Sequence, residues 1–281
     1  MPGPEKEEPV QALDGGPQIN ILFSAPDFTV PCPDSGGVKI ARISPEIVVK
    51  FGSHVTLAEA KNMMFAKQNT ETLPVPKIFA CYSYGPINRD IEDHGSLFDT
   101  YIFMSFVESQ TLDKVWESYD EDTKAHVTNQ LKEYLLELRQ IRNGSYIGSA
   151  NSGPVTDQIL ESYHDRLTLR KIFNNAIIDA YQSKAPKRQI KNFLSGMLCQ
   201  NNHQIVFTHG DLRLQNIMVN DGSVSGILYW EFSGWYPEYW EFLKALYIWQ
   251  WQNDWTDYLV QILRPYYAEY TIHCFLTETL W

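Results

Sequence analysis

The sequence has no block rich in Lys and Arg and no long apolar run. Its 34 acidic residues outnumber the 23 basic ones and give a formal charge of −11, whereas proteins that bind the nucleic-acid phosphate backbone carry a basic surface. No apolar run approaches the roughly 20 residues that a bilayer-spanning helix needs. We therefore expect neither a nucleic-acid partner nor a membrane span.

Cysteines are few and lie far apart in the chain. Cys32, Cys81, Cys199 and Cys274 form no CxxC pair and have no neighbouring His pattern, so neither a zinc site nor a disulfide framework is predicted. The start MPGPEKEEPVQ is acidic and proline-rich, whereas a secretory signal is basic and then apolar. These features predict reduced thiols and a cytoplasmic protein with a disordered tail over residues 1–20.

The region that follows the tail is rich in β-branched and aromatic residues. The segments VKIARI, EIVVKFG, KIFACYSYG and TYIFMSFV predict strands, and one helix-forming segment begins at Thr56 between them. We expect a small lobe over residues 21–108, built from a β-sheet and one helix.

After this lobe the apolar spacing becomes helical. Five residues recur at the interval of a helix that buries one face: Leu131, Tyr134, Leu135, Leu138 and Ile141. PEYWEFLKALYIWQ and TDYLVQILRPYYAEY predict two later helices with aromatic faces. We expect a hinge near Glu108 and a larger, mainly helical lobe over residues 109–281.

The stretch VFTHGDLRLQNIMV predicts two apolar strands joined by a polar loop. Phosphoryl transfer needs a carboxylate that accepts the proton of the substrate hydroxyl and an amide oxygen that holds a metal. Asp211 and Asn216 lie five residues apart on this loop. The two side chains can therefore converge on one point.

Together with VVKFG, YIGS and WEFSGWYPEYWE, this motif resembles the aminoglycoside phosphotransferase-like family, small-molecule relatives of protein kinases, and its fungal members most closely. The resemblance covers about residues 38–250. It implies an α+β, two-lobed, protein-kinase-like fold, a small-molecule substrate, and ATP and Mg²⁺ as the cofactors. By similarity, Asp211 is the base and Asn216 a magnesium ligand. Lys50, held by Glu59, is the partner of the nucleotide phosphates.

Simpler interpretations of these residues are also open. Lys50 can be the charged end of a strand, and Asp211 can be a turn residue. Glu59 follows Thr56 by three residues, which is the spacing of a helix capping box. We expect His209 to be a packed, hydrogen-bonded loop residue and not a catalyst.

A double glycine and an aromatic stretch each allow both a functional and a structural interpretation. Gly36 and Gly37 in CPDSGGVK are the only candidates for a phosphate-covering loop, and a double glycine is also common in plain turns. The aromatic stretch SGWYPEYWEF can form a substrate wall by stacking. We expect instead a core-facing helix start with Pro237 in its first turn.

GILYWEF departs from the family pattern at Tyr229. In the family this strand ends in an aspartate that binds the metal, and an uncharged phenol does not replace that charge. The loss would slow phosphoryl transfer by roughly a thousandfold or more. Glu231 would point to the same side as Tyr229 if the segment is extended, and so could fill the place. Glu231 can equally be a turn or cap residue.

Arg213 is a second departure, because close fungal relatives usually have histidine there. A permanent cation two residues from Asp211 either weakens that carboxylate as a base or holds an anionic substrate.

Three functions remain open. The first is an enzyme of fungal secondary metabolism whose interlobe pocket performs non-phosphoryl chemistry, such as proton transfer, elimination or cyclisation, with Asp211 intact and Tyr229 as an acid or hydrogen-bond donor. The second is a working ATP-dependent O-phosphotransferase in which Asn216 and Glu231 hold the metals. The third is a pseudokinase that binds a partner or ligand without catalysis. We expect the first; the residues assign no oligomeric state.

Overall fold

A computed structural model describes most of the chain after the predicted tail. The described residues are 37–89, 96–142, 146–157, 170–184, 191–198, 203–246 and 253–280. Residues 1–20 and Gly36 therefore lie outside them. The chain divides into two compact units, of which the first contains residues up to Ala60 and Pro76–Val107, and the second contains Lys61–Val75 and Glu108–Trp281.

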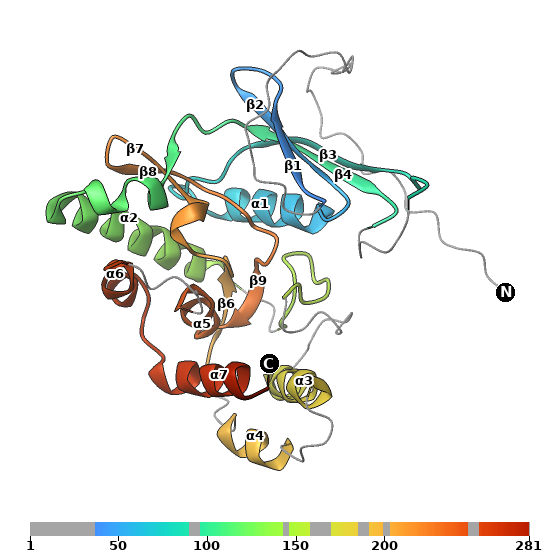
Figure 1. Ribbon diagram of the computed structural model, residues 1–281, viewed down its shortest axis with the longest axis vertical. Helices are drawn as coiled ribbons and strands as arrows, with labels where there is room; N and C mark the ends of the chain where they lie inside the picture. Colours follow the sequence, from blue (N-terminus) through green and yellow to red (C-terminus); the bar gives the residue numbers. More distant parts are fainter. Residues whose placement is uncertain are drawn as a thin grey trace. The chain divides into compact units, whose positions relative to one another are not determined.

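The first unit is built on a four-stranded antiparallel sheet with the strand order β1-β2-β4-β3 (Figure 1). Its strands are β1 (Lys39–Arg42), β2 (Ile47–Gly52), β3 (Ile78–Tyr84) and β4 (Asp99–Ser105). The helix α1 (Leu57–Asn69) follows β2, and the boundary between the units falls within it. All four predicted strands and the predicted helix are present.

A small apolar core packs between this sheet and the start of α1. Val55, Ala60 and Ile102 are buried together there, and Ile78 and Cys81 pack against them. Ala60 lies in the first turns of α1, so the start of this helix packs on the sheet through a small side chain.

The second unit contains most of the helices and three short antiparallel pairings. Its helices are α2 (Glu121–Gln140), α3 (Arg170–Lys184), α4 (Lys191–Met197), α5 (Trp240–Leu246), α6 (Trp255–Ile262) and α7 (Tyr267–Leu280), with the 3₁₀ turns η2 (Leu112–Lys114), η3 (Trp116–Ser118) and η5 (Leu214–Asn216). Its strands are β5 (Gln110–Thr111), β6 (Ile205–Thr208), β7 (Ile217–Asn220), β8 (Ser223–Ile227) and β9 (Gly234–Pro237). Figure 1 shows α3, α4 and α7 lying together in this unit.

The helix α2 shows how the sequence specifies this unit. Asp120 is its N-cap, and the side chain accepts a hydrogen bond from the Thr123 backbone N–H at 2.9 Å. Leu131, Leu135 and Leu138 are buried along one face, which confirms the helical interpretation of their spacing. The helix packs against α6, β6 and β8.

Two pairings position the polar loop between β6 and β7. β6 pairs antiparallel with β9, and β7 lies between β5 and β8. The loop that contains Asp211 therefore leaves one small sheet and enters another. Both of its ends are fixed by strand pairing.

The aromatic stretch after Tyr229 differs from the expected helix start. Pro237 ends the strand β9, and α5 begins only at Trp240. Trp235, Tyr236, Trp240 and Phe242 are all at most 2% exposed, so these rings lie in the core of the second unit, as the core-facing interpretation expected.

The last predicted helix is in fact two helices. TDYLVQILRPYYAEY spans α6 and α7, which are separated around Pro265 because proline lacks the N–H that a continuing helix needs. Residues 247–250, at the end of the helix predicted before it, lie outside the described residues. None of the described helices combines the length and apolarity of a membrane span.

Candidate active site

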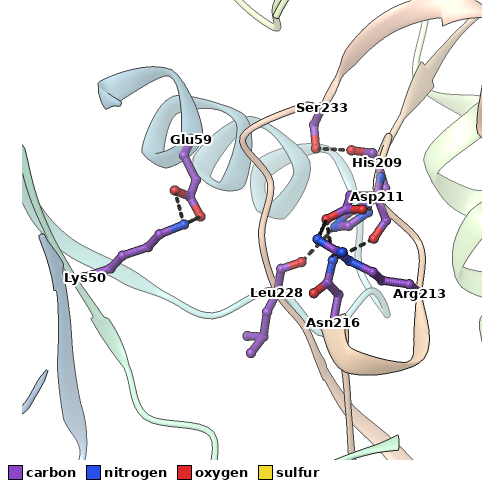
Figure 2. A network of polar contacts seen from close by, with 8 residues as sticks. All are labelled: Lys50, Glu59, His209, Asp211, Arg213, Asn216, Leu228 and Ser233. Carbon is purple, nitrogen blue, oxygen red and sulfur yellow. Dashed lines mark hydrogen bonds and ion pairs between the residues drawn. The ribbon is translucent and has the colours of Figure 1, made fainter. Parts of the chain in front are cut away.

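Asp211 lies at the centre of a polar network on the loop between β6 and β7 (Figure 2). Its Oδ2 accepts hydrogen bonds from Arg213 Nη2 and from Asn216 Nδ2, each at 2.7 Å. The Asp211 side chain is 19% exposed and that of Arg213 is 45% exposed. The cation that the sequence places beside Asp211 is therefore paired directly with it.

Only one orientation of the Asn216 side-chain amide satisfies its hydrogen-bond partners. Its Nδ2 donates to the backbone carbonyl of Asp211 and to the Asp211 carboxylate, both at 2.7 Å. Both of these atoms are acceptors, so the amide nitrogen must face them and the amide oxygen must face the other way. Asn216 is 2% exposed and ends the turn η5, which fixes this orientation.

The backbone of the loop is held by a carboxylate that sequence analysis did not assign. Glu241, in α5, accepts the N–H groups of His209 at 2.7 Å and Gly210 at 3.1 Å. The Glu241 residue is 2% exposed. Gly210 has a φ of 83°, and a Cβ there would lie 2.6 Å from the Phe232 carbonyl oxygen, so only glycine fits this position without strain.

His209 packs as the sequence analysis expected. Its Nδ1 accepts the backbone N–H of Asp211 at 3.2 Å, and its Nε2 lies 2.9 Å from the Leu228 carbonyl oxygen. The tautomer with the proton on Nε2 satisfies both contacts. Ser233 Oγ donates to the His209 carbonyl oxygen at 2.8 Å (Figure 2). His209 therefore orients the loop and does not face a substrate through either nitrogen.

Tyr229 has a left-handed backbone with a φ of 63°, which is uncommon for a bulky residue. The residues on both sides of it are held by buried side chains. His209 binds the Leu228 carbonyl oxygen, and Asn62 Nδ2 donates to the carbonyl oxygens of Trp230 and Ser233, both at 2.9 Å. The surrounding structure thus imposes the conformation of Tyr229.

This conformation removes one argument for Glu231. The expectation that Glu231 and Tyr229 point to the same side required an extended segment, and Tyr229 is not extended. Glu231 and Phe232 lie in a turn that directly precedes Ser233. Its assignment as a metal ligand stays a prediction without that support.

Lys50 and Glu59 form a buried ion pair within the first unit. Lys50 Nζ lies 2.9 Å from Glu59 Oε1 and 2.7 Å from Oε2, and the side chains are 3% and 2% exposed (Figure 2). Lys50 lies inside β2, so its interpretation as a charged strand end is wrong. The nucleotide-binding role of the pair stays a prediction.

Gly37 has a φ of 86°, and a Cβ there would lie 2.1 Å from His54 Nδ1. A local turn therefore already accounts for this glycine. Its partner in the proposed phosphate loop, Gly36, is outside the described residues.

Three positioning residues of the loop were missed: Asn62, Ser233 and Glu241. Ser233 and Glu241 belong to the motif WEFSGWYPEYWE, in which Glu231 was the only polar residue that received a role. Asn62 has no sequence signal, because a polar residue in a helix usually faces solvent, whereas here it is fully buried. Only the tertiary structure brings these side chains to the loop.

Comparison with known proteins identifies the family of this chain. A family model described as the phosphotransferase enzyme family, APH, matches residues 42–273, and the chain belongs to this family. A search of curated proteins found no match.

Solved structures confirm the α+β kinase-like fold. The GDP and kanamycin complex of APH(2″)-IIia has a TM-score of 0.54 at 11% identity, and covers 92% of this chain and 84% of that one. The GDP complex of aminoglycoside 2′-phosphotransferase-IIIa has a TM-score of 0.52 at 12% identity, with coverage of 86% and 79%. A thermostable mutant of APH(4)-Ia in its apo form has a TM-score of 0.51 at 12% identity, with coverage of 90% and 88%. At such identities the likeness establishes the fold alone.

Proposed function

We propose that this chain is a small-molecule enzyme of the phosphotransferase family that has diverged from Mg-ATP phosphoryl transfer towards acid–base chemistry, such as elimination or cyclisation, in fungal secondary metabolism. One observation supports this proposal above the others. A phenol stands at Tyr229, where the family resemblance places a metal-binding aspartate, while Asp211 and Asn216 keep an ordered hydrogen-bond network beside it.

The residues fit a magnesium ion only in part. Mg²⁺ binds oxygen ligands and is usually held by one or two carboxylates together with phosphates. The amide oxygen of Asn216 is turned away from Asp211 and suits such an ion. A phenol at position 229 is uncharged at neutral pH and does not supply the missing anion. We therefore assign no reaction step to the metal.

Asp211 can act on a substrate without a metal. Its Oδ2 accepts hydrogen bonds from Arg213 and Asn216, which fix the direction of the carboxylate. No described residue donates to Oδ1, so this oxygen is the one that would accept a substrate proton. In an elimination, Asp211 would take that proton and the Tyr229 hydroxyl would give one to the leaving group.

A second candidate is an active ATP-dependent O-phosphotransferase that uses Asn216 and Glu231 for the metal. The orientation of the Asn216 amide and the buried Lys50–Glu59 pair favour it. A buried ion pair is seldom more stabilising than apolar residues of the same size, so a nucleotide-binding role would explain why the pair is there.

The test measures ligand-dependent thermal stability with ATP, Mg²⁺, both and neither. A ligand at 100 times its dissociation constant stabilises the folded chain by about 2.7 kcal/mol. We expect Mg²⁺ to add nothing to any shift caused by ATP in the wild type, and to add a clear shift in Tyr229→Asp. Tyr229→Asn is the matched control, because it tolerates the same left-handed backbone without the charge.

Two results would contradict the first candidate. ADP release that strictly requires ATP and Mg²⁺, and that is lost in Glu231→Gln, would establish the phosphotransferase instead. An Asp211→Asn variant that leaves every cellular product unchanged would favour a non-catalytic binding protein.

A further inference from the structure

The strand β3 forms one edge of the sheet in the first unit. Five of its seven residues are exposed, and within the described residues β4 is its only strand partner. An edge strand presents a row of backbone N–H and C=O groups to any strand that approaches it. β3 therefore has the geometry that a further strand would need.

Apart from an irregularity at its first end, β3 lacks the features that usually protect such an edge. Ile78–Tyr84 reads IFACYSY, with no charged residue and no proline. The register shift between Ile78 and Ala80 affects only the first end of the strand. Long, uncharged, apolar edges are predicted association sites, because nothing in them repels a second strand.

Stacked rings support the exposed end of this edge. Tyr82 stacks on Tyr101 of β4 with 5.3 Å between ring centroids, and Tyr101 stacks on Phe51 of β2 at 5.5 Å. These contacts run across three strands in register. They hold the Tyr82 side chain in place, so less side-chain entropy is lost when another surface covers it.

Exposed apolar side chains gather at this edge. Of the nine large hydrophobic residues that are exposed in the described part of the chain, five lie on β3 or directly before β4: Phe79, Tyr82, Tyr84, Leu97 and Phe98. The four aromatic residues are 42–66% exposed and present roughly 400 Å² in total. That is about half of the 800 Å² that each partner buries in a standard interface.

We propose that β3 pairs antiparallel with β3 of a second copy of this chain, which joins two four-stranded sheets into one across a twofold axis. A second copy is the partner that this edge fits, because a twofold interface brings the same patch together on both sides. The rest of the buried area would have to come from the backbone of the edge and its neighbouring side chains. The absence of charge on β3 allows close approach although each chain carries a charge of −11.

The test is sedimentation of the full chain over a concentration series, with Tyr84→Lys as the disrupting variant. Tyr84 is 66% exposed, so its replacement leaves the fold intact, which circular dichroism verifies. We expect a wild-type dimer at micromolar concentration and a dissociation constant at least about tenfold higher in Tyr84→Lys, because the twofold axis introduces two charges at once. Leu136→Lys is the control, because Leu136 is 52% exposed and lies on α2 of the second unit.

Hydrogen exchange adds a readout that locates the contact. Dimer formation by this route slows exchange of the backbone amides in β3 and not in the exposed turns of α2. A wild-type chain that stays monomeric up to about 100 µM would overturn the proposal. A dimer that is insensitive to Tyr84→Lys and leaves β3 exchange unchanged would overturn it as well.

Discussion

At the residue scale, the loop of Asp211 depends on a buried acid that never faces a substrate. Glu241 accepts two consecutive backbone N–H groups, those of His209 and Gly210. Without it these donors would be buried and unpaired, which costs about 1–3 kcal/mol for each group. Glu241, the last residue of the motif WEFSGWYPEYWE, therefore has a structural role.

We predict that Glu241→Gln lowers the free energy of unfolding by about 2 kcal/mol, because the amide offers one acceptor and turns a donor towards the other N–H. Urea unfolding measures this loss, and hydrogen exchange of His209 and Gly210 shows whether it is local. Glu133→Gln, an exposed change on α2, is expected to stay within about 0.5 kcal/mol. Unchanged exchange at both amides would refute the role of Glu241.

At the element scale, the first unit joins β2 to α1 through one buried ion pair. Lys50 and Glu59 are both almost fully buried, and their charged groups are 2.7 Å apart. Removing one partner of such a pair leaves an uncompensated charge in a medium of low polarity. Replacing both partners by apolar side chains removes both charges together.

We predict that Glu59→Gln and Lys50→Met each lower the free energy of unfolding by about 3 kcal/mol or more. The double variant Lys50→Met/Glu59→Leu should regain most of this loss, because no charge stays buried. Chemical denaturation of all three variants measures the coupling. The control is Glu46→Gln in the same unit, at an exposed position; single variants as stable as this control would contradict the prediction.

At the scale of the whole molecule, the pH dependence of stability follows from buried titratable groups in the second unit. Burial lowers the pKa of His273 from 6.5 to about 4; the nearby Lys244 adds to this effect and Asp157 opposes it. The unfolded chain thus binds a proton near pH 6.5 that the folded chain binds only near pH 4. Stability consequently falls as the pH drops through this window.

We predict a loss of up to roughly 3 kcal/mol from His273 between pH 6.5 and pH 4. His273→Leu should flatten the pH dependence over this window, even if its stability at neutral pH also changes. Denaturation at several pH values measures the slope. His126→Leu changes an exposed histidine on α2 and should leave the slope as it is; an unchanged slope in His273→Leu would exclude this assignment.

Below this window, acidic groups add to the loss. Hydrogen bonds that the Asp120 carboxylate accepts from the side chain and backbone N–H of Thr123 lower the pKa of Asp120. The pKa of Asp254 is also lowered: burial alone would raise it, and hydrogen bonds from Lys124 and Trp116 overcome that effect. Carboxylates with lowered pKa values stabilise the folded chain above their unfolded pKa and stop doing so as the pH falls through the folded value.

The sequence alone determined the elements of the first unit and the position of the polar loop. The β-branched and aromatic composition of the strand segments and the helical spacing of Leu131, Leu135 and Leu138 are local properties of the chain, so they are visible without any tertiary contact. The order of the motifs also determined the family, which the match over residues 42–273 confirms. The assignment of the family to a fungal branch stays a prediction.

Only the tertiary structure decided which side chains meet. Asn62 reaches Trp230 and Ser233 across more than 160 residues of chain, and no local pattern encodes a contact of that separation. The left-handed backbone of Tyr229 also depends on tertiary structure. A bulky residue rarely adopts this conformation, and here the buried partners of its neighbours impose it. The periodicity of a segment predicts which of its residues are buried. The segment that packs against them is determined by the packing of the whole unit.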